Sequence, residues 1–143
     1  MTTINPYLLF NGNAEKAFNF YKSVFGGDFS MIQRFKDTPE ADKVSSAEKE
    51  RIVHVSLPLG KGSVLMGSDT AESIGQKVTV GNNFSISVNA ESEDEVRRLF
   101  NGLSAGGTVT MPLGKTFWGA YFGMFIDLYG VTWMISYDYK QQN

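Results

Sequence analysis

The sequence predicts an α+β fold made of two copies of one module, in which a strand and a helix are followed by three further strands (βαβββ). Three observations support this fold class. The expected elements occur in the same order in both halves of the chain. Residues 62–68 also match residues 130–136, with Met66 aligned to Met134 and Ser68 to Ser136. Such a repeat indicates that the core is built twice and that the halves pair.

The third observation is an aromatic and glycine-rich stretch at residues 116–136. Two β-rich runs in it flank residues 127–130, which begin with Asp127 and end with Gly130. Asp at the first position and Gly at the last are typical of a type I turn. The stretch therefore predicts a hairpin that supplies the last two strands of the second module.

In the first module, about residues 1–68, an apolar run at residues 4–10 predicts a strand that ends at Asn11-Gly-Asn13. Asn13 can cap the following helix, because its side-chain oxygen can accept a backbone N–H. Apolar residues at helical spacing predict that helix, and Gly26-Gly27 ends it. Residues 36–50 form a charged loop. We expect the other three strands at residues 29–35, 51–59 and 63–68.

Residues 69–81 are polar without periodicity, which predicts a linker inside a single domain of residues 1–143. The second module, about residues 82–143, starts with a strand in which apolar and polar residues alternate from Phe84 to Asn89. Ser92 and Glu95 predict a capping box before the second helix. The remaining strands are a short one at residues 109–111 and the two arms of the hairpin.

Composition excludes several function classes. The formal charge of −2 gives no electrostatic basis for binding nucleic acid or an anionic membrane, and no apolar run is long enough to span a bilayer. There is no cysteine, so disulfides and a thiol nucleophile are excluded. The first residues lack the pattern of a signal peptide. We therefore expect a cytoplasmic protein.

Several motifs follow one another along the chain: Asn5-Pro-Tyr7, Phe20-Tyr21, His54, residues 65–69, 116–118 and 127–130, and Trp133-Met-Ile. Their order and spacing resemble the vicinal-oxygen-chelate superfamily, which includes glyoxalase I, extradiol dioxygenases and bleomycin-binding proteins. Within that superfamily they are most similar to the PhnB-like branch. Leu128 stands where relatives often have proline. The resemblance implies that each module curls a mixed sheet around a cup, that helices pack outside, and that the protein is a homodimer.

Alternation along the strands predicts which side chains line the cup. Phe84, Ile86 and Val88 should face the helices, as should Val55 and Leu57. The predicted lining is apolar with scattered hydroxyls and one imidazole, which suits a small amphipathic ligand. The ligand-binding candidates in this lining are Phe10, His54, Ser56, Met66, Asn83, Ser85 and Met134.

Metal-dependent relatives take one ligand from the first and one from the last strand of each module, usually His or Glu. By the repeat alignment these positions hold Pro6, Met66, Asn83 and Met134. Proline cannot ligate, methionine suits soft Cu(I), and one asparagine cannot hold a divalent ion. We therefore expect no metal site and no other cofactor.

His54 is the only histidine and could act as a general base or as a donor to a ligand. No third residue could be identified to orient it, so a nucleophilic triad is not predicted. Trp118 and Tyr121, with Phe117 and Phe122, could form an aromatic wall for a planar ligand, or could pack in the core or a dimer. Asp127 is explained by its turn.

Three hypotheses remain open. The first is a metal-free protein that binds a small molecule. The second is a metal-independent enzyme with His54 as acid or base, and Ser56 or Asn83 polarising a substrate oxygen. The third is a structural or regulatory homodimer without a specific ligand. Relatives are sometimes labelled demethylubiquinone methyltransferases, but no strand here leads into the glycine-rich turn that binds S-adenosylmethionine. Whether one chain or a dimer builds the cup stays open.

Overall fold

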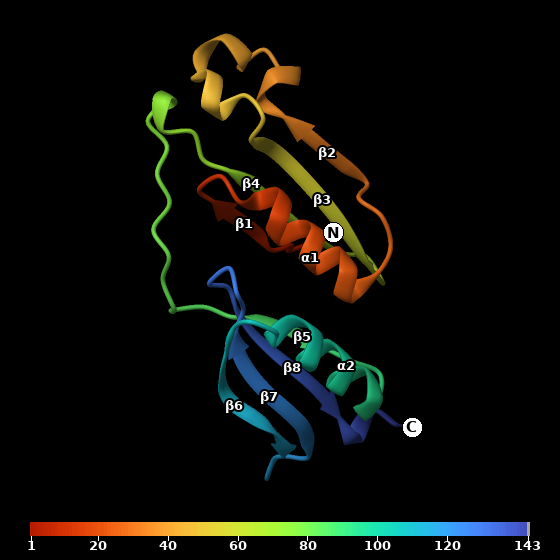
Figure 1. The fold of residues 1–143 in the computed structure, drawn as a ribbon. Helices are drawn as coiled ribbons and strands as arrows, with labels where there is room; N and C mark the ends of the chain where they lie inside the picture. The colour runs from red at the N-terminus through yellow and green to blue at the C-terminus, as the bar shows by residue number, and fades with distance from the viewer. Residues whose placement is uncertain (143) are drawn as a thin grey trace. The chain divides into compact units, whose positions relative to one another are not determined.

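The computed structural model describes residues 1–142 and divides into two compact units, one of Met1–Thr79 and one that begins at Val80. Each unit contains a four-stranded mixed sheet with one α-helix lying along it (Figure 1). The predicted α+β class and the two-module repeat are confirmed. None of the helices in the described residues is both long and apolar enough to cross a membrane.

The first sheet has the strand order β1-β4-β3-β2. Strand β1 runs parallel to β4, and the other pairs are antiparallel. Between β2 and β3 the charged loop forms three short 3₁₀ turns. The elements of this unit are β1 (Tyr7–Phe10), α1 (Ala14–Phe25), β2 (Met31–Arg34), β3 (Ile52–Gly60) and β4 (Ser63–Asp69).

The second sheet repeats this arrangement as β5-β8-β7-β6, with β5 parallel to β8. Strand β6 is longer than the three residues that were predicted, because its pairing with β7 continues through two irregularities to Lys115. The elements of this unit are β5 (Ile86–Asn89), α2 (Glu93–Ser104), β6 (Thr108–Lys115), β7 (Ala120–Ile126) and β8 (Thr132–Asp138).

Each helix buries one apolar stripe against its own sheet. Phe18 of α1 is fully buried, and its ring lies over Gly67 of β4. In the second unit Phe100 of α2 lies over Gly123 of β7 and meets the Phe125 ring edge-on at 5.1 Å. Burying an aromatic or aliphatic side chain in this way stabilises the fold by about 1.5–3 kcal/mol.

The start of α1 differs from the prediction. The Asn13 side chain makes no cap hydrogen bond. Instead the buried carboxylate of Asp69, at the end of β4, accepts the backbone N–H groups of Gly12 and Ala14, both at 2.9 Å. Its other oxygen accepts the N–H of Ile52 at 2.9 Å. The helix is thus capped by a carboxylate from a strand distant in the sequence and not by the adjacent Asn13. Asp69 belongs to β4 rather than to the predicted linker.

The predicted cap of α2 is half confirmed. The Ser92 hydroxyl accepts the Glu95 N–H at 3.1 Å, but the Glu95 carboxylate bonds the N–H of Glu91 rather than that of Ser92. The hairpin turn is also as predicted. Asp127 accepts the N–H groups of Tyr129 and Val131, at 2.8 and 3.0 Å. Its second oxygen accepts the indole N–H of Trp133 at 2.8 Å, so the turn is joined to the core.

Candidate functional site

Each sheet has one face covered by its helix and a second face without one. Directly paired strand residues point to the same face of a sheet. On the first sheet, the register pairs Tyr7 with Met66, Met66 with Ser56, and Ser56 with Met31. Because Val55 and Leu65 on the alternate positions are fully buried beneath α1, this row lies on the opposite side, which we call the open face of the first sheet.

A chain of hydrogen bonds crosses this open face. The Tyr7 hydroxyl lies 3.2 Å from His54 Nδ1, and His54 Nε2 lies 2.8 Å from the Ser56 hydroxyl. The Tyr7 and His54 rings are 5.6 Å apart and tilted by 31°. Both ring nitrogens of the imidazole are therefore engaged by hydroxyl groups, which fixes the ring orientation.

The tyrosine reaches this position by spanning a strand. Strands β1 and β3 lie on either side of β4, so Tyr7 and His54 come from strands separated by about 10 Å. The side chain of Tyr7 must therefore extend over β4. Tyr7 is 45% exposed and the neighbouring Leu9 is 50% exposed, whereas Ser56 is only 8% exposed. The polar chain thus runs from an exposed end at Tyr7 to a buried end at Ser56, with the exposed apolar side chains of Leu9 and Met31 on the same face.

The open face of the second sheet is different in character. Ser87 pairs with Met134, and Phe122 pairs with Ser136. Trp118 covers Phe122 edge-on at 5.6 Å and stays 50% exposed. Its turn is held by hydrogen bonds of 3.0 Å from the Ala120 N–H to the Thr116 hydroxyl and 3.1 Å from the Tyr139 N–H to the Gly119 carbonyl. Trp118 is therefore presented by a well-bonded turn.

Several side chains lie on the faces that alternation predicts. His54, Ser56 and Met66 share the open face of the first sheet, and Met134 lies on that of the second. The structure brings His54 and Ser56 into direct contact. Their role in binding a ligand stays a prediction.

The predicted facing of Phe10 is wrong. Phe10 is 4% exposed, and its ring meets Phe18 of α1 edge-on at 6.1 Å, so it is a core residue. The register shows the cause: Tyr7 stands opposite Met66 as Ser87 stands opposite Met134. The predicted alignment of the first strand was shifted by one residue, which exchanged its two faces. The residues of this strand on the open face are Tyr7 and Leu9.

Tyr121 also faces the helix side. It pairs with the buried Tyr137, and the Arg97 guanidinium of α2 lies 5.8 Å from its ring centre. The four aromatics therefore do not form one wall. Trp118 and Phe122 touch on the open side, Phe117 is 97% exposed, and Tyr121 lies beneath α2.

Asn83 and Ser85 precede β5, which begins at Ile86 rather than at Phe84. Asn83 is exposed and Ser85 is half-buried. Phe84, expected to face the helices, is 59% exposed. Within the second sheet, Ser87 rather than Asn83 or Ser85 is the β5 residue that pairs beside Met134.

Sequence reasoning missed Tyr7. It belongs to an entirely apolar run, so alternation gave no information on its facing. One signal was available, since Tyr7 is the only residue in the short strand Tyr7–Phe10 that carries a hydrogen-bonding side chain. A buried or half-buried tyrosine hydroxyl usually finds a polar partner, and His54 is the only imidazole in the chain.

The corrected register changes two of the four positions at which metal-dependent relatives hold a metal ligand. The residues paired beside Met66 and Met134 on the first strands are Tyr7 and Ser87. Within the described residues, no group of three or more His, Cys, Asp or Glu side chains is arranged to hold a metal ion. The donor set at these four positions is a phenol, a hydroxyl and two thioethers, which does not fit the hard divalent ions of metal-dependent relatives.

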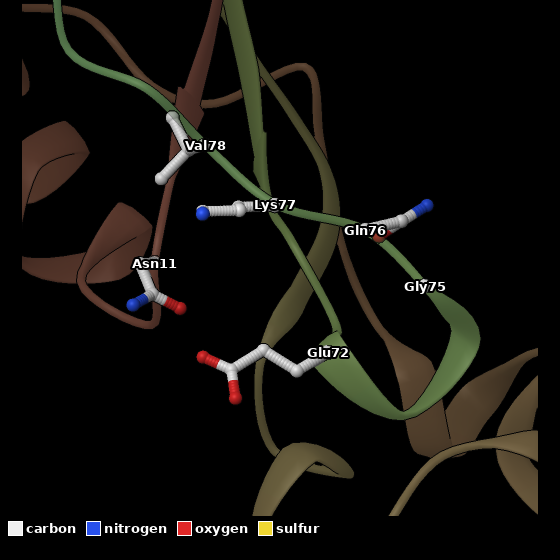
Figure 2. Close-up of a pocket in the computed structure, with 6 residues that line it drawn as sticks. All are labelled: Asn11, Glu72, Gly75, Gln76, Lys77 and Val78. Atoms are coloured by element: carbon white, nitrogen blue, oxygen red, sulfur yellow. The ribbon is translucent and has the colours of Figure 1, made fainter.

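Two surface hollows of the first unit lie apart from the open face. One, of about 460 Å³, is formed where the chain leaves β4, and Figure 2 shows the Glu72 carboxylate and the Lys77 side chain directed to the side on which Asn11 lies. The other, of about 670 Å³, surrounds the start of α1 and contains Arg34 and Arg51. Arg34 is paired with Glu15, which lowers the pKa of that carboxyl through a hydrogen bond. Neither hollow includes a predicted ligand-binding residue.

Comparison with known proteins gives a consistent family. A family model described as 3-demethylubiquinone-9 3-methyltransferase matches residues 2–136. Protein YjdN from Escherichia coli (strain K12) is 31% identical over 142 residues, covering 93% of each chain.

Several solved structures are also similar to this chain. Protein PA1353 from Pseudomonas aeruginosa is 40% identical with a TM-score of 0.85, over 96% of this chain and 98% of that one. A PhnB protein from Bacillus cereus is 29% identical with a TM-score of 0.74, over 95% and 99%. A glyoxylase/bleomycin resistance protein/dioxygenase domain from Frankia sp. EAN1pec shares the fold at 13% identity, with a TM-score of 0.68 over 96% and 98%. The chain therefore belongs to the PhnB-like branch of the vicinal-oxygen-chelate superfamily, the family whose model is described as 3-demethylubiquinone-9 3-methyltransferase.

Proposed function

We propose that the protein binds a small amphipathic organic molecule on the open face of its first sheet, without a metal ion. The observation that carries this proposal is the Tyr7–His54–Ser56 hydrogen-bonded chain set among exposed apolar side chains. Leu9 and Met31 are each 50% exposed on that face. A mainly apolar surface with a few fixed polar groups is the usual composition of a small-molecule site.

The proposal is tested with planar probes of matched shape. The probes are 2-acetylnaphthalene and 2-ethylnaphthalene. Their binding is measured by the change in melting temperature of the protein and by changes in backbone amide chemical shifts in two-dimensional NMR. We expect both to shift amides of β1, β3 and β4. Leu9→Lys places a charge on the open face and should weaken binding at least about tenfold, since an apolar contact is replaced by a charge that must be desolvated.

The matched control is Leu128→Lys, at a 59% exposed position in the 127–130 turn, which should leave binding unchanged. If neither probe binds, or if both lysine variants bind like the wild type, the proposal is wrong. A homodimer with a structural role and no ligand would then be the better description.

A second candidate, a metal-independent enzyme, is supported by one contact. His54 Nε2 lies 2.8 Å from the Ser56 hydroxyl while Tyr7 holds the other ring nitrogen, so the imidazole has an orienting partner. Such a base could take up a proton from beside a carbonyl group through the exposed Tyr7 hydroxyl, which would accept the substrate proton as it passes its own proton to His54 Nδ1. Deuterium exchange into the methyl group of 2-acetylnaphthalene in D₂O tests this. Exchange that is catalysed by the wild type and lost in His54→Ala, with binding retained, would support it; equal exchange rates would exclude it.

The methyltransferase activity in the family description is not part of our proposal. Rossmann-like cofactor sites form at the carboxyl ends of adjacent parallel strands. In the described residues each sheet has one parallel pair only, β1 with β4 and β5 with β8. The turn between β1 and α1 is Asn11-Gly-Asn13, and the N–H groups of Gly12 and Ala14 are already bonded to the Asp69 carboxylate. That carboxylate stands where a cofactor carboxyl or phosphate would otherwise be held.

We also propose that two chains associate as a homodimer. In the described chain each sheet has two outer strands, β1 and β2 in the first and β5 and β6 in the second. Ile32 of β2 and Val109 of β6 both lie on the helix side of their sheets, where they pair with the buried Val55 and Phe125. They nevertheless remain 42% and 45% exposed. Apolar side chains on an outer strand favour contact with another chain.

A further inference from the structure

The Tyr7–His54–Ser56 chain has a property that follows from counting its protons. The phenol, the neutral imidazole and the serine hydroxyl each carry one hydrogen-bonding proton, which makes three. The two contacts, at 3.2 and 2.8 Å, use two of them. One hydroxyl proton therefore always remains to be donated outside the chain, at one of its two ends.

The imidazole decides which end donates. With the proton on Nε2, His54 donates to Ser56 and accepts from Tyr7, so the Ser56 proton is the one left over. With the proton on Nδ1, His54 donates to the Tyr7 oxygen and accepts from Ser56, so the Tyr7 proton is left over. The two arrangements differ only in the direction of both hydrogen bonds.

Burial distinguishes the two ends. Ser56 is 8% exposed, whereas Tyr7 is 45% exposed and lies beside the exposed Leu9 on the same face. A ligand on the open face therefore meets the Tyr7 hydroxyl. An incoming oxygen that accepts a hydrogen bond favours the arrangement with the proton on Nδ1, since only that arrangement frees the Tyr7 proton.

We propose that Tyr7, His54 and Ser56 form a reversible hydrogen-bond relay whose exposed Tyr7 hydroxyl selects ligands that carry a carbonyl or carboxylate oxygen beside an apolar ring. This inference rests on the proposed ligand site and adds the chemical class of its ligand. The relay gives a role to three polar groups that lie in series across this sheet face. Tyr7 is the specificity-determining residue, and His54 and Ser56 position its proton.

The sole histidine makes the relay directly observable. In ¹⁵N-labelled protein, long-range proton–nitrogen correlation of His54 reports which ring nitrogen carries the proton. With 2-acetylnaphthalene bound we expect Nδ1 to be protonated. With 2-ethylnaphthalene, which has a methylene in place of the carbonyl, we expect the same spectrum as in the free protein. Protonation on Nε2 in the ketone complex would overturn the proposal.

Affinity gives an independent readout. One net hydrogen bond corresponds to about a 2- to 12-fold preference for the ketone over the ethyl probe. Tyr7→Phe should abolish this preference while still binding the ethyl probe. Tyr121→Phe, the same change at a tyrosine that faces α2, should retain it. Equal affinity of the wild type for both probes would contradict the relay alone, whereas failure of both probes to bind would contradict the ligand site as well.

Discussion

Asp69 shows at the scale of one residue how a buried carboxylate can organise two elements. It is 3% exposed and accepts three backbone N–H groups, two at the start of α1 and one at the start of β3. Asp69→Asn exchanges one acceptor oxygen for an amino group that must face a backbone N–H. We expect a loss of about 2–4 kcal/mol in the free energy of unfolding, measured by urea denaturation.

The control for this prediction is Asp28→Asn. The Asp28 side chain is 92% exposed and forms only a surface contact with Lys22, so its loss should change stability by less than about 0.5 kcal/mol. Similar unfolding midpoints for the two variants would show that Asp69 is not the cap of α1.

Glu48 makes stability depend on pH. Hydrogen bonds from the Ser73 hydroxyl, and then from the Ser45 backbone N–H, lower the pKa of Glu48 to about 2. Because the folded pKa lies below the ordinary value of 4.5, this stabilisation is complete above pH 4.5 and is lost as the pH falls toward 2. The difference in unfolding midpoint between wild type and Glu48→Gln should therefore be largest at pH 6 and smaller at pH 3.

Glu72→Gln is the matched variant, since it removes the same charge from an exposed neighbour of Ser73. Its difference from wild type should be small at both pH values. A Glu48→Gln difference that grew on acidification would have the wrong sign and would refute the role of these hydrogen bonds.

The residues also show what the sequence could predict about the candidate site. In β3, polar His54 and Ser56 alternate with Val55 and Leu57, so their facing was correct. Strands Tyr7–Phe10 and Ala120–Ile126 contain one tyrosine each and are otherwise apolar, so polar residues do not alternate with apolar ones and a one-residue shift that exchanges the two faces leaves no clear mark in the sequence. That is why Phe10 and Tyr121 were misplaced and Tyr7 was missed.

At the scale of elements, each helix depends on a glycine in the strand beneath it. A Cβ on Gly67 would lie 2.7 Å from Phe18 and 2.8 Å from the Leu8 carbonyl oxygen, and one on Gly123 would lie 2.6 Å from Phe100. In both modules the helix therefore packs on the sheet in the same way: an aromatic ring of the helix contacts the backbone of a strand glycine that has no side chain.

Gly67→Ala should cost about 1–3 kcal/mol of unfolding free energy, because the contact with backbone cannot relax by side-chain rotation. Thermal and urea unfolding measure this. Gly114→Ala, in strand β6 with nothing within 4 Å of the added carbon, is the control and should have little effect. Equal stability of the two variants would mean that α1 can move away from its sheet without loss.

Helix ends show where local sequence was sufficient. Ser92 caps α2 from the adjacent position, and this could be predicted from spacing. The cap of α1 comes from Asp69, which is 55 residues from Ala14, and no local pattern could reveal it. Element order and the repeat depend on composition and periodicity, so they were predictable, whereas contacts between distant segments were not.

At the scale of the whole molecule, the homodimer proposal makes a mass prediction. Light scattering should give twice the chain mass of 15.8 kDa. Ile32→Lys and Val109→Lys should raise the dimer dissociation constant at least about tenfold, since each removes a buried apolar contact in both copies. Val80→Lys, at a 71% exposed position, is the control. If light scattering gives the mass of a single chain for the wild type, the homodimer proposal is wrong.

The origin of the α1 cap also sets an order of events during synthesis. A twelve-residue helix is marginal by itself, and α1 lacks its carboxylate until Asp69 has left the ribosome. We therefore expect unit Met1–Thr79 to acquire its helix and its sheet together, late in its own translation. Helix α2 carries Ser92 with it and can begin to form before β6 is made. We therefore expect two modules of the same architecture to fold by different routes, the first through a contact of long sequence separation and the second from a local start.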